Sequence, residues 1–218
     1  MTERWRSIHA NGRWTTPAFP EEIKRRYELE SMISAEFIRD GELAEVFETL
    51  QHTALLLNLQ HACDTAVNGA LFRDAVGYAQ AVLAFHAQRD DYTDRVSECL
   101  GRGITAFLAA TYRLPGLYEH PCLAVSTDKL ADCLDKSKDI IRMLPTEVQI
   151  WLVLVRHMSM RESSADLSLS DKSEEALMGG MAWTELRRQA KQVMWFDAIH
   201  DDLGERAWKH LQAITDHN

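Results

Sequence analysis

The sequence predicts an all-α protein built from antiparallel helix pairs. Apolar residues recur at intervals of three and four along most of the chain, which gives a helix one apolar face, and no segment shows the sustained alternation of a half-buried strand. The clearest stretch is 54–108, where two helical stripes are separated by a turn and a third stripe begins. Such helix pairs cannot bury their apolar faces alone, so we expect them to stack and leave a concave surface for a partner.

Start and stop signals place the first helix between residues 20 and 40. Pro20 suits the first turn of a helix, and the two acidic residues after it lie where the positive end of the helix dipole stabilises them. Gly41 is the kind of residue that commonly ends a helix. We therefore expect one helix over 20–40, a stop at Gly41 and a new helix from Glu42.

Between Glu42 and Phe107, apolar stripes predict further helices joined by two short connections. Asn68 and Gly69 form a strong turn signal, and a polar link follows at 89–91. The stripes are Leu43, Val46, Phe47 and Leu50; Leu56, Leu59, Cys63 and Ala66; Ala75, Val76, Ala79, Val82 and Leu83; and Val96, Leu100, Gly103, Ile104 and Phe107.

The second half of the chain is expected to continue as helices. Proline and glycine predict a loop over 112–126, a helix should run from Asp128 to Pro145, and an apolar helix over 148–158 should cover the end of the stack. Later helices are expected over 183–193 and from Asp201. The predicted organisation is an irregular arm (1–19), a repeat-like helical domain (20–158), a mobile linker (159–170) and C-terminal helices (171–218).

Composition disfavours several classes of function. The chain has 218 residues and a formal net charge of -9, which opposes binding to a nucleic-acid backbone. No apolar run approaches the roughly 20 residues of a membrane span. None of the 4 cysteines forms a CxxC pair, and three of them lie at apolar helical positions, so buried free thiols are favoured over disulfides. This pattern predicts an intracellular, reducing compartment, the cytoplasm first and the mitochondrial matrix as the alternative.

Several small and polar residues occur in the order found in a known repeat. Asn58 follows a run of leucines, Ala75 and the pair at 82–83 lie in the next helix, and Arg102 and Gly103 open the sequence Arg-Gly-Ile-Thr-Ala. This pattern resembles tetratricopeptide repeats (TPR), particularly the C-terminal repeat domain of immunophilin-type co-chaperones. The resemblance implies a groove for a partner protein, lined by Asn58, Gln60 and Arg102.

The same comparison shows where the chain departs from the family. Equivalent first-helix positions, Gln60 and Gly103, lie 43 apart, beyond the repeat of about 34 residues. Chaperone-binding members hold a C-terminal carboxylate with lysines, an arginine and asparagines, and of these Asn58 alone matches. The other clamp positions fall on Glu30, Ser34, Ser97 and Gly101, so binding of chaperone tails is not expected.

Acidic residues open an alternative with catalysis. Asp90, Asp91, Asp94 and Glu98 spell DDxxDxxxE, which in an isoprenoid synthase would hold magnesium and a diphosphate, with Asp201, Asp202 and Glu205 as a second cluster. The plainer interpretation is that these are acids at the start of a helix. Two further pairs, Glu48 with His52 and Asp197 with His200, have the spacing of di-metal ligands.

The leading hypothesis is a non-catalytic scaffold or adaptor that binds other proteins, with no cofactor or resident metal. Trp5 and Trp14 in the N-terminal arm are further candidates for partner contact, since tryptophan commonly anchors one surface on another. An accessory structural subunit of a large assembly is the first alternative. A metal-dependent all-α enzyme is the second.

Overall fold

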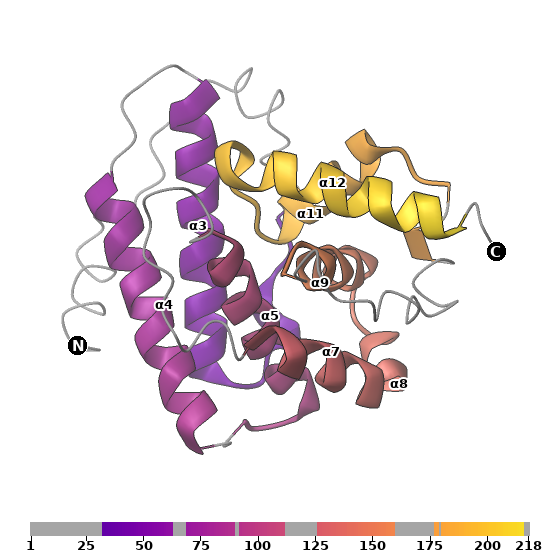
Figure 1. The fold of residues 1–218 in the computed structure, drawn as a ribbon. Coiled ribbons are helices and arrows are strands. Elements are labelled where there is room, and N and C mark those ends of the chain that lie inside the picture. The colour runs from indigo at the N-terminus through magenta and orange to yellow at the C-terminus, as the bar shows by residue number, and fades with distance from the viewer. Residues whose placement is uncertain are drawn as a thin grey trace.

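The computed structural model describes residues 32–62, 69–89, 92–111, 126–159, 177–178 and 180–215, and every regular element in them is helical. Figure 1 shows their arrangement. The all-α class is therefore confirmed. The elements are η2 (Ala35–Phe37), α3 (Gly41–Ala62), α4 (Gly69–Arg89), α5 (Arg95–Thr111), α7 (Ser126–Lys136), α8 (Lys138–Ile141), α9 (Thr146–Ser159), α11 (Trp183–Val193) and α12 (Asp197–Thr215).

The start of α3 corrects the first predicted helix. Residues 32–40 form the short 3-10 turn η2 and extended backbone, so the expected helix does not extend over them. Asp40 accepts hydrogen bonds at 3.1 Å from the backbone N–H groups of Glu42 and Leu43. Such bonds satisfy the free donors of a helix N-terminus. Gly41 is thus the first residue of α3, where the sequence had indicated a stop.

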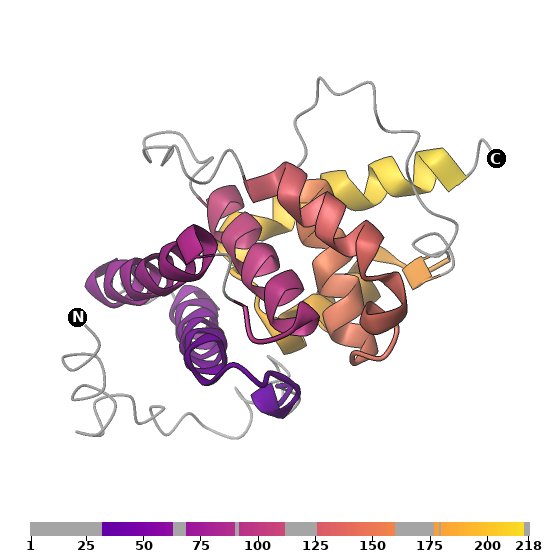
Figure 2. The same ribbon diagram turned by 90° about the horizontal axis from the view of Figure 1, so that it is seen from below.

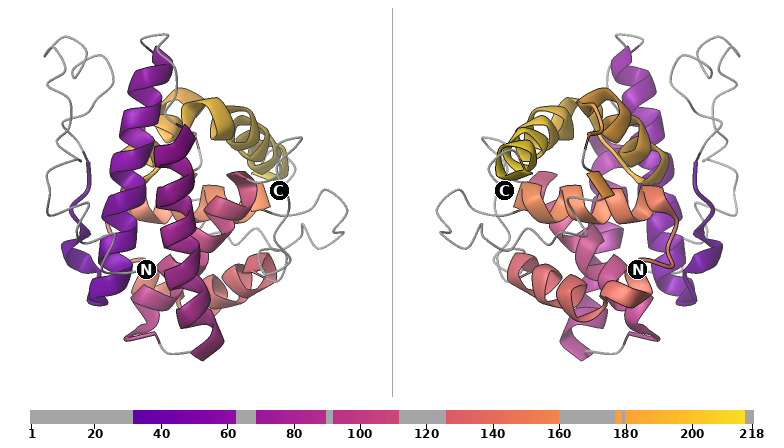
Figure 3. Two further views of the ribbon diagram at one scale, coloured as in Figure 1. Left: turned by 90° about the vertical axis from the view of Figure 1, so that its left-hand side faces the viewer. Right: turned by 90° about the vertical axis from the view of Figure 1, so that its right-hand side faces the viewer.

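The long helices α3 and α4 lie side by side at one edge of the molecule (Figure 3). The first predicted stripe and the first two residues of the second, Leu56 and Leu59, belong to one helix of 22 residues, and α4 has 21. Cys63 and Ala66 lie outside the described residues. Each helix is longer than half of a TPR repeat, which contains two helices in about 34 residues. The TPR-like arrangement stays a prediction.

Helix α9 is the centre of the fold, although the sequence had placed it as a cover at one end. It packs against α5, α7, α11 and α12. Figure 1 shows α9 along its axis with α11 and α12 on one side and α5 and α7 on the other. Its side chains are buried almost all round, as expected for a helix inside a core. Six of them have no exposed surface: Val148, Ile150, Trp151, Leu152, Leu154 and Val155.

The C-terminal helices follow the prediction in part. Helix α11 has the predicted bounds, whereas α12 begins at Asp197, four positions before the expected start. The ring of His200 explains the earlier start, because its Nδ1 accepts the backbone N–H of Phe196 at 3.2 Å. The helix predicted over 128–145 is divided at Ser137 into α7 and α8.

Contacts between distant segments close the fold. Helix α12 packs against α3 and α5 as well as α9, so helices from both ends of the described chain meet. Seen from below, α5 lies between the α3–α4 pair and the group formed by α7 and α9 (Figure 2). No described helix is long and apolar enough to cross a membrane. Several predicted segments lie outside the described residues: the arm (1–19), the loop over 112–126 except Ser126, and the linker over 159–170 except Ser159.

Candidate functional site

A shallow groove lies between one face of α3 and the C-terminal end of α11. Residues at positions 51, 54, 55 and 58 follow the spacing of a single helical face, so α3 supplies one wall. The groove is small: its cavity volume is about 20 Å³, within about 430 Å³ of atom-free space that includes open solvent. Its lining comprises Met32, Gln51, Ala54, Leu55, Asn58, Arg188, Lys191, Gln192, Met194 and Trp195.

Two amide side chains fix the walls of the groove to each other. Gln51 donates hydrogen bonds of 3.1 Å to the carbonyl oxygens of Ile33 and Gln192. Two helical turns later, the Asn58 amide donates to the Trp195 carbonyl at 2.8 Å and accepts the Asp197 N–H at 2.9 Å. Because both amides bond to backbone atoms, they hold α3 at one position along the chain that joins α11 to α12.

Charged residues of α11 form the rim. Arg188 pairs with Glu185, and hydrogen bonds from Arg188 and Gln189 lower the pKa of Glu185 to about 2. The Lys191 Nζ lies 2.8 Å from the Asp197 Oδ2. The Arg188 side chain is 39% exposed and that of Lys191 is 15% exposed, so Arg188 is the more accessible cation. The α11 side of the groove therefore carries paired charges, and Leu55 on α3 supplies a half-buried apolar side chain to the lining.

The predicted groove residues are separated by the fold. Asn58 does line the groove, but it is 8% exposed and its amide bonds within the chain, where an open concave position had been expected. Gln60 is half-buried near the end of α3 and is not part of the lining. Arg102 lies on α5 and pairs with Glu98. Trp5 and Trp14 lie outside the described residues.

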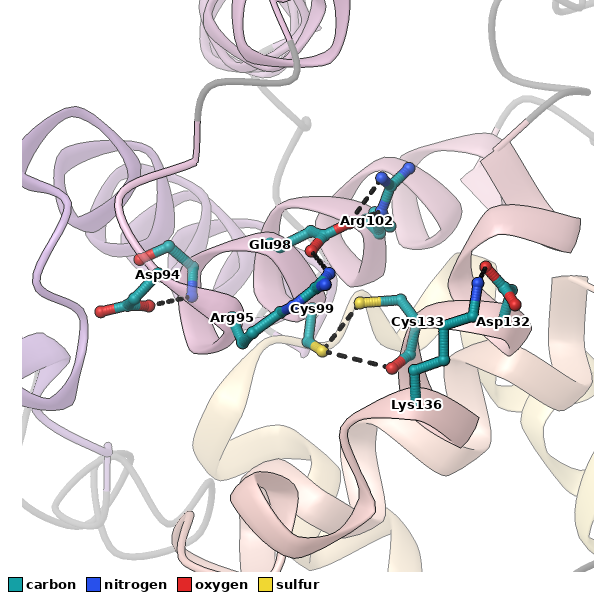
Figure 4. Close-up of polar contacts among 9 residues, drawn as sticks. Asp94, Arg95, Glu98, Cys99, Arg102, Asp132, Cys133 and Lys136 are labelled. Carbon is teal, nitrogen blue, oxygen red and sulfur yellow. Dashed lines mark hydrogen bonds and ion pairs between the residues drawn. The ribbon is translucent and has the colours of Figure 1, made fainter.

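The described acidic candidates for a metal site have structural partners (Figure 4). Asp94 accepts the N–H of Ser97 at 2.8 Å and so caps α5. Glu98 is held by Arg102 and Arg95. Burial alone would raise the pKa of Glu98, but hydrogen bonds from the two arginines outweigh burial and lower it. Asp90 and Asp91 lie outside the described residues.

The two proposed ligand pairs differ in environment. Glu48 and His52 are exposed on α3. His200 is fully buried, where burial lowers its pKa to about 3 and keeps the ring neutral. Its Nε2 lies 3.3 Å from the Thr111 hydroxyl, and Asp197 binds Arg187 and Lys191. Within the described ranges, no three histidine, cysteine or acidic side chains gather in a way that could hold a metal ion.

Comparison with known proteins gives no relative: no protein-family model, curated protein or solved structure matches the chain. The resemblance to TPR proteins thus stays an expectation. The α11 side of the groove, including Arg188 and Trp195, was not predicted from the sequence. The spacing of Gln51, Ala54 and Asn58 could have indicated a shared face on α3, but nothing local links that face to residues more than 130 positions later.

Proposed function

We propose that the protein is a non-catalytic scaffold that binds a segment of another protein in the groove between α3 and α11. The observation that carries this proposal is the combination of partly exposed apolar residues in the lining with walls held in place by internal hydrogen bonds. Leu55 and Met32 are half-buried and face the groove. A site whose walls are already fixed loses little conformational entropy when a partner binds.

The chemistry of the lining indicates the kind of segment that fits. An apolar side chain such as leucine or methionine would cover Leu55 and the stems of Arg188 and Lys191. A carbonyl or carboxylate beside it would share the donors of Arg188, which is the more exposed cation of the rim. A short peptide with an apolar residue next to an acidic one is therefore the proposed ligand.

The structural use of the acidic candidates supports a non-catalytic role. Asp94 is a helix cap, and Glu98 neutralises two arginines. His200 sits in the core and bonds to backbone and hydroxyl groups. Each of these side chains contributes to the packing or the capping of the helices. A structural role therefore explains these residues, and no catalytic role is needed.

Binding of peptides selected from a random displayed library tests the proposal. Leu55→Asp should weaken binding of a selected peptide at least tenfold, equivalent to about 1.4 kcal/mol, because it puts a charge on the apolar part of the lining. Leu56→Asp is the matched control, since Leu56 is also half-buried on α3 but does not line the groove.

Fluorescence anisotropy with the labelled peptide would measure both affinities, and circular dichroism would verify that both variants fold. Equal affinity for the wild type and Leu55→Asp would contradict the proposal. Equal loss in Leu55→Asp and Leu56→Asp would also contradict it, because the effect would then not belong to the groove.

A further inference from the structure

The two described cysteines lie against each other in the core. Cys99 is on α5 and Cys133 on α7, and these two helices pack side by side. The sulfur atoms are 2.9 Å apart, and the Cys99 sulfur lies 3.9 Å from the Cys133 carbonyl oxygen (Figure 4). Both residues are free cysteines and both are buried, which agrees with the expectation from sequence for these two.

The contact between the sulfurs is closer than ordinary packing allows. Even carbon atoms that are not bonded settle about 3.5–4.0 Å apart, and sulfur is larger. A disulfide has its sulfurs about 2.0 Å apart. The sulfurs at 2.9 Å therefore need to approach by about 0.9 Å to form a bond. Because α5 and α7 already pack against each other, the two sulfurs start close to bonding distance.

The two thiols are not equivalent. The hydrogen bond from Cys133 lowers the pKa of Cys99, with a further contribution from Ser137. The same contact, together with burial, raises the pKa of Cys133. Cys99 is therefore the first to lose its proton, and a thiolate is the form that attacks an oxidant.

We propose that Cys99 and Cys133 form a reversible dithiol–disulfide site that responds to a hydroperoxide. The Cys99 thiolate attacks one peroxide oxygen, the O–O bond breaks, and water leaves with the proton that Cys99 had released. The Cys133 sulfur then attacks the Cys99 sulfur, the S–O bond breaks, and a second water leaves with the Cys133 proton. In total two thiols and one hydrogen peroxide give one disulfide and two waters.

The surroundings explain why this pair is specific. Cys99 is 0% exposed and Cys133 is 3% exposed. Even a molecule as small as hydrogen peroxide therefore reaches the sulfurs only through local opening of the fold. Each sulfur has the other as its nearest reaction partner, so the oxidised intermediate is captured at once. The product links α5 to α7 and closes the loop between residues 99 and 133, which constrains the unfolded chain.

The test uses the full chain in which Cys63 and Cys122, the other two cysteines, are replaced by serine. This Cys63→Ser/Cys122→Ser protein retains the proposed pair intact. After exposure to hydrogen peroxide and alkylation of the remaining thiols, peptide mass spectrometry should find Cys99 and Cys133 joined. The melting temperature Tm should rise by on the order of 10 °C and return when dithiothreitol is added.

Any of four results would overturn the proposal. One is that both cysteines still react fully with the alkylating reagent after peroxide treatment. Another is accumulation of sulfinic acid on Cys99 without a disulfide. The third is a cross-link that lowers Tm, since that would show that native packing does not hold the sulfurs near bonding positions. The wild type, treated in parallel, should form the same Cys99–Cys133 link, and pairing with Cys63 or Cys122 instead would also overturn it.

Discussion

Helices α9 and α3 both contribute many buried residues, but they are held in different ways. The buried face of α9 is made mainly of aliphatic side chains and Trp151. The buried residues of α3 include Thr49, Gln51, Thr53 and Asn58 as well as leucines. Of these, Gln51 and Asn58 bond to backbone atoms near the junction of α11 and α12. One helix is thus fixed mainly by apolar packing and the other by directed hydrogen bonds too.

The two kinds of contact have different consequences: apolar burial stabilises a helix in the core, and hydrogen bonds set its position relative to its neighbours. Burial of apolar surface is roughly proportional to area and has no direction, so burial by itself does not select one position of α9 along its neighbours. Amide hydrogen bonds require particular partners and geometry. The bonds from Gln51 and Asn58 therefore determine where α3 docks, and this position creates the groove.

The largest expected effect is at the centre of α9. Trp151→Ala removes a side chain with no exposed surface and the 2.8 Å bond from its indole N–H to the Met194 carbonyl. We expect the free energy of unfolding to fall by about 3–5 kcal/mol, measured by urea denaturation. Trp151→Phe, which keeps an aromatic ring, should cost less. A loss below about 1 kcal/mol for Trp151→Ala would show that α9 is not the centre of the core.

The next effect is at the amide contact of α3. Asn58→Ala leaves the Trp195 carbonyl and the Asp197 N–H without their partner, so we expect a loss of about 2–3 kcal/mol. The same urea denaturation would measure it. His52→Ala, on the exposed side of α3, is the control and should change stability by less than about 0.5 kcal/mol. Equal effects of the two changes would remove the distinction between α3 and α9.

A pair of helix glycines tests how tightly α5 contacts α9. A Cβ at Gly103 would lie 2.6 Å from a Leu152 methyl and 3.1 Å from the Trp151 ring, whereas a Cβ at Gly77 has nothing within 4 Å. Gly103→Ala should therefore destabilise by about 1–2 kcal/mol through overpacking. Gly77→Ala should stabilise by about 0.5–1 kcal/mol, because alanine favours a helix over glycine. Thermal unfolding would compare them, and a shift of the same sign in both would contradict the packing described here.

The last effect comes from the buried histidine and is measured within a narrow pH range. Since burial lowers the pKa of His200 to about 3, from 6.5 when unfolded, the unfolded chain binds a proton first. The contribution to stability is complete above pH 6.5 and is lost as the pH falls toward 3. Between pH 7.5 and 5.5 we expect a loss of about 1.4 kcal/mol, before carboxylates titrate.

Urea denaturation at the two pH values would measure this loss, with exposed His52→Gln as the control. His200→Phe should reduce the pH dependence, because phenylalanine cannot take up a proton. An unchanged dependence in His200→Phe would assign the effect to another group.

Much of the local structure could be predicted because periodicity reports on each segment by itself. The helix predicted over 183–193 is α11 with its observed bounds. The turn predicted at 68–69 is only partly described, and there Gly69 is the first residue of α4. The predicted helix starts were wrong where a polar side chain accepts a hydrogen bond from the backbone at a helix N-terminus, because apolar periodicity does not report such bonds. Asp40 starts a helix at the glycine expected to stop one, and the His200 ring supports an earlier start of α12.

The sequence by itself determined the all-α class, most helices, and the burial of Cys99 and Cys133, because helical spacing shows which face of a segment avoids water. The tertiary structure alone decided what each face meets. It placed Asn58 against Trp195, brought the two sulfurs within 2.9 Å, and set α9 at the centre of the fold. These outcomes depend on contacts between residues from 34 to more than 130 positions apart. Many packings are compatible with the same pattern of apolar residues, and side-chain shape and the hydrogen-bond partners on other helices select one of them.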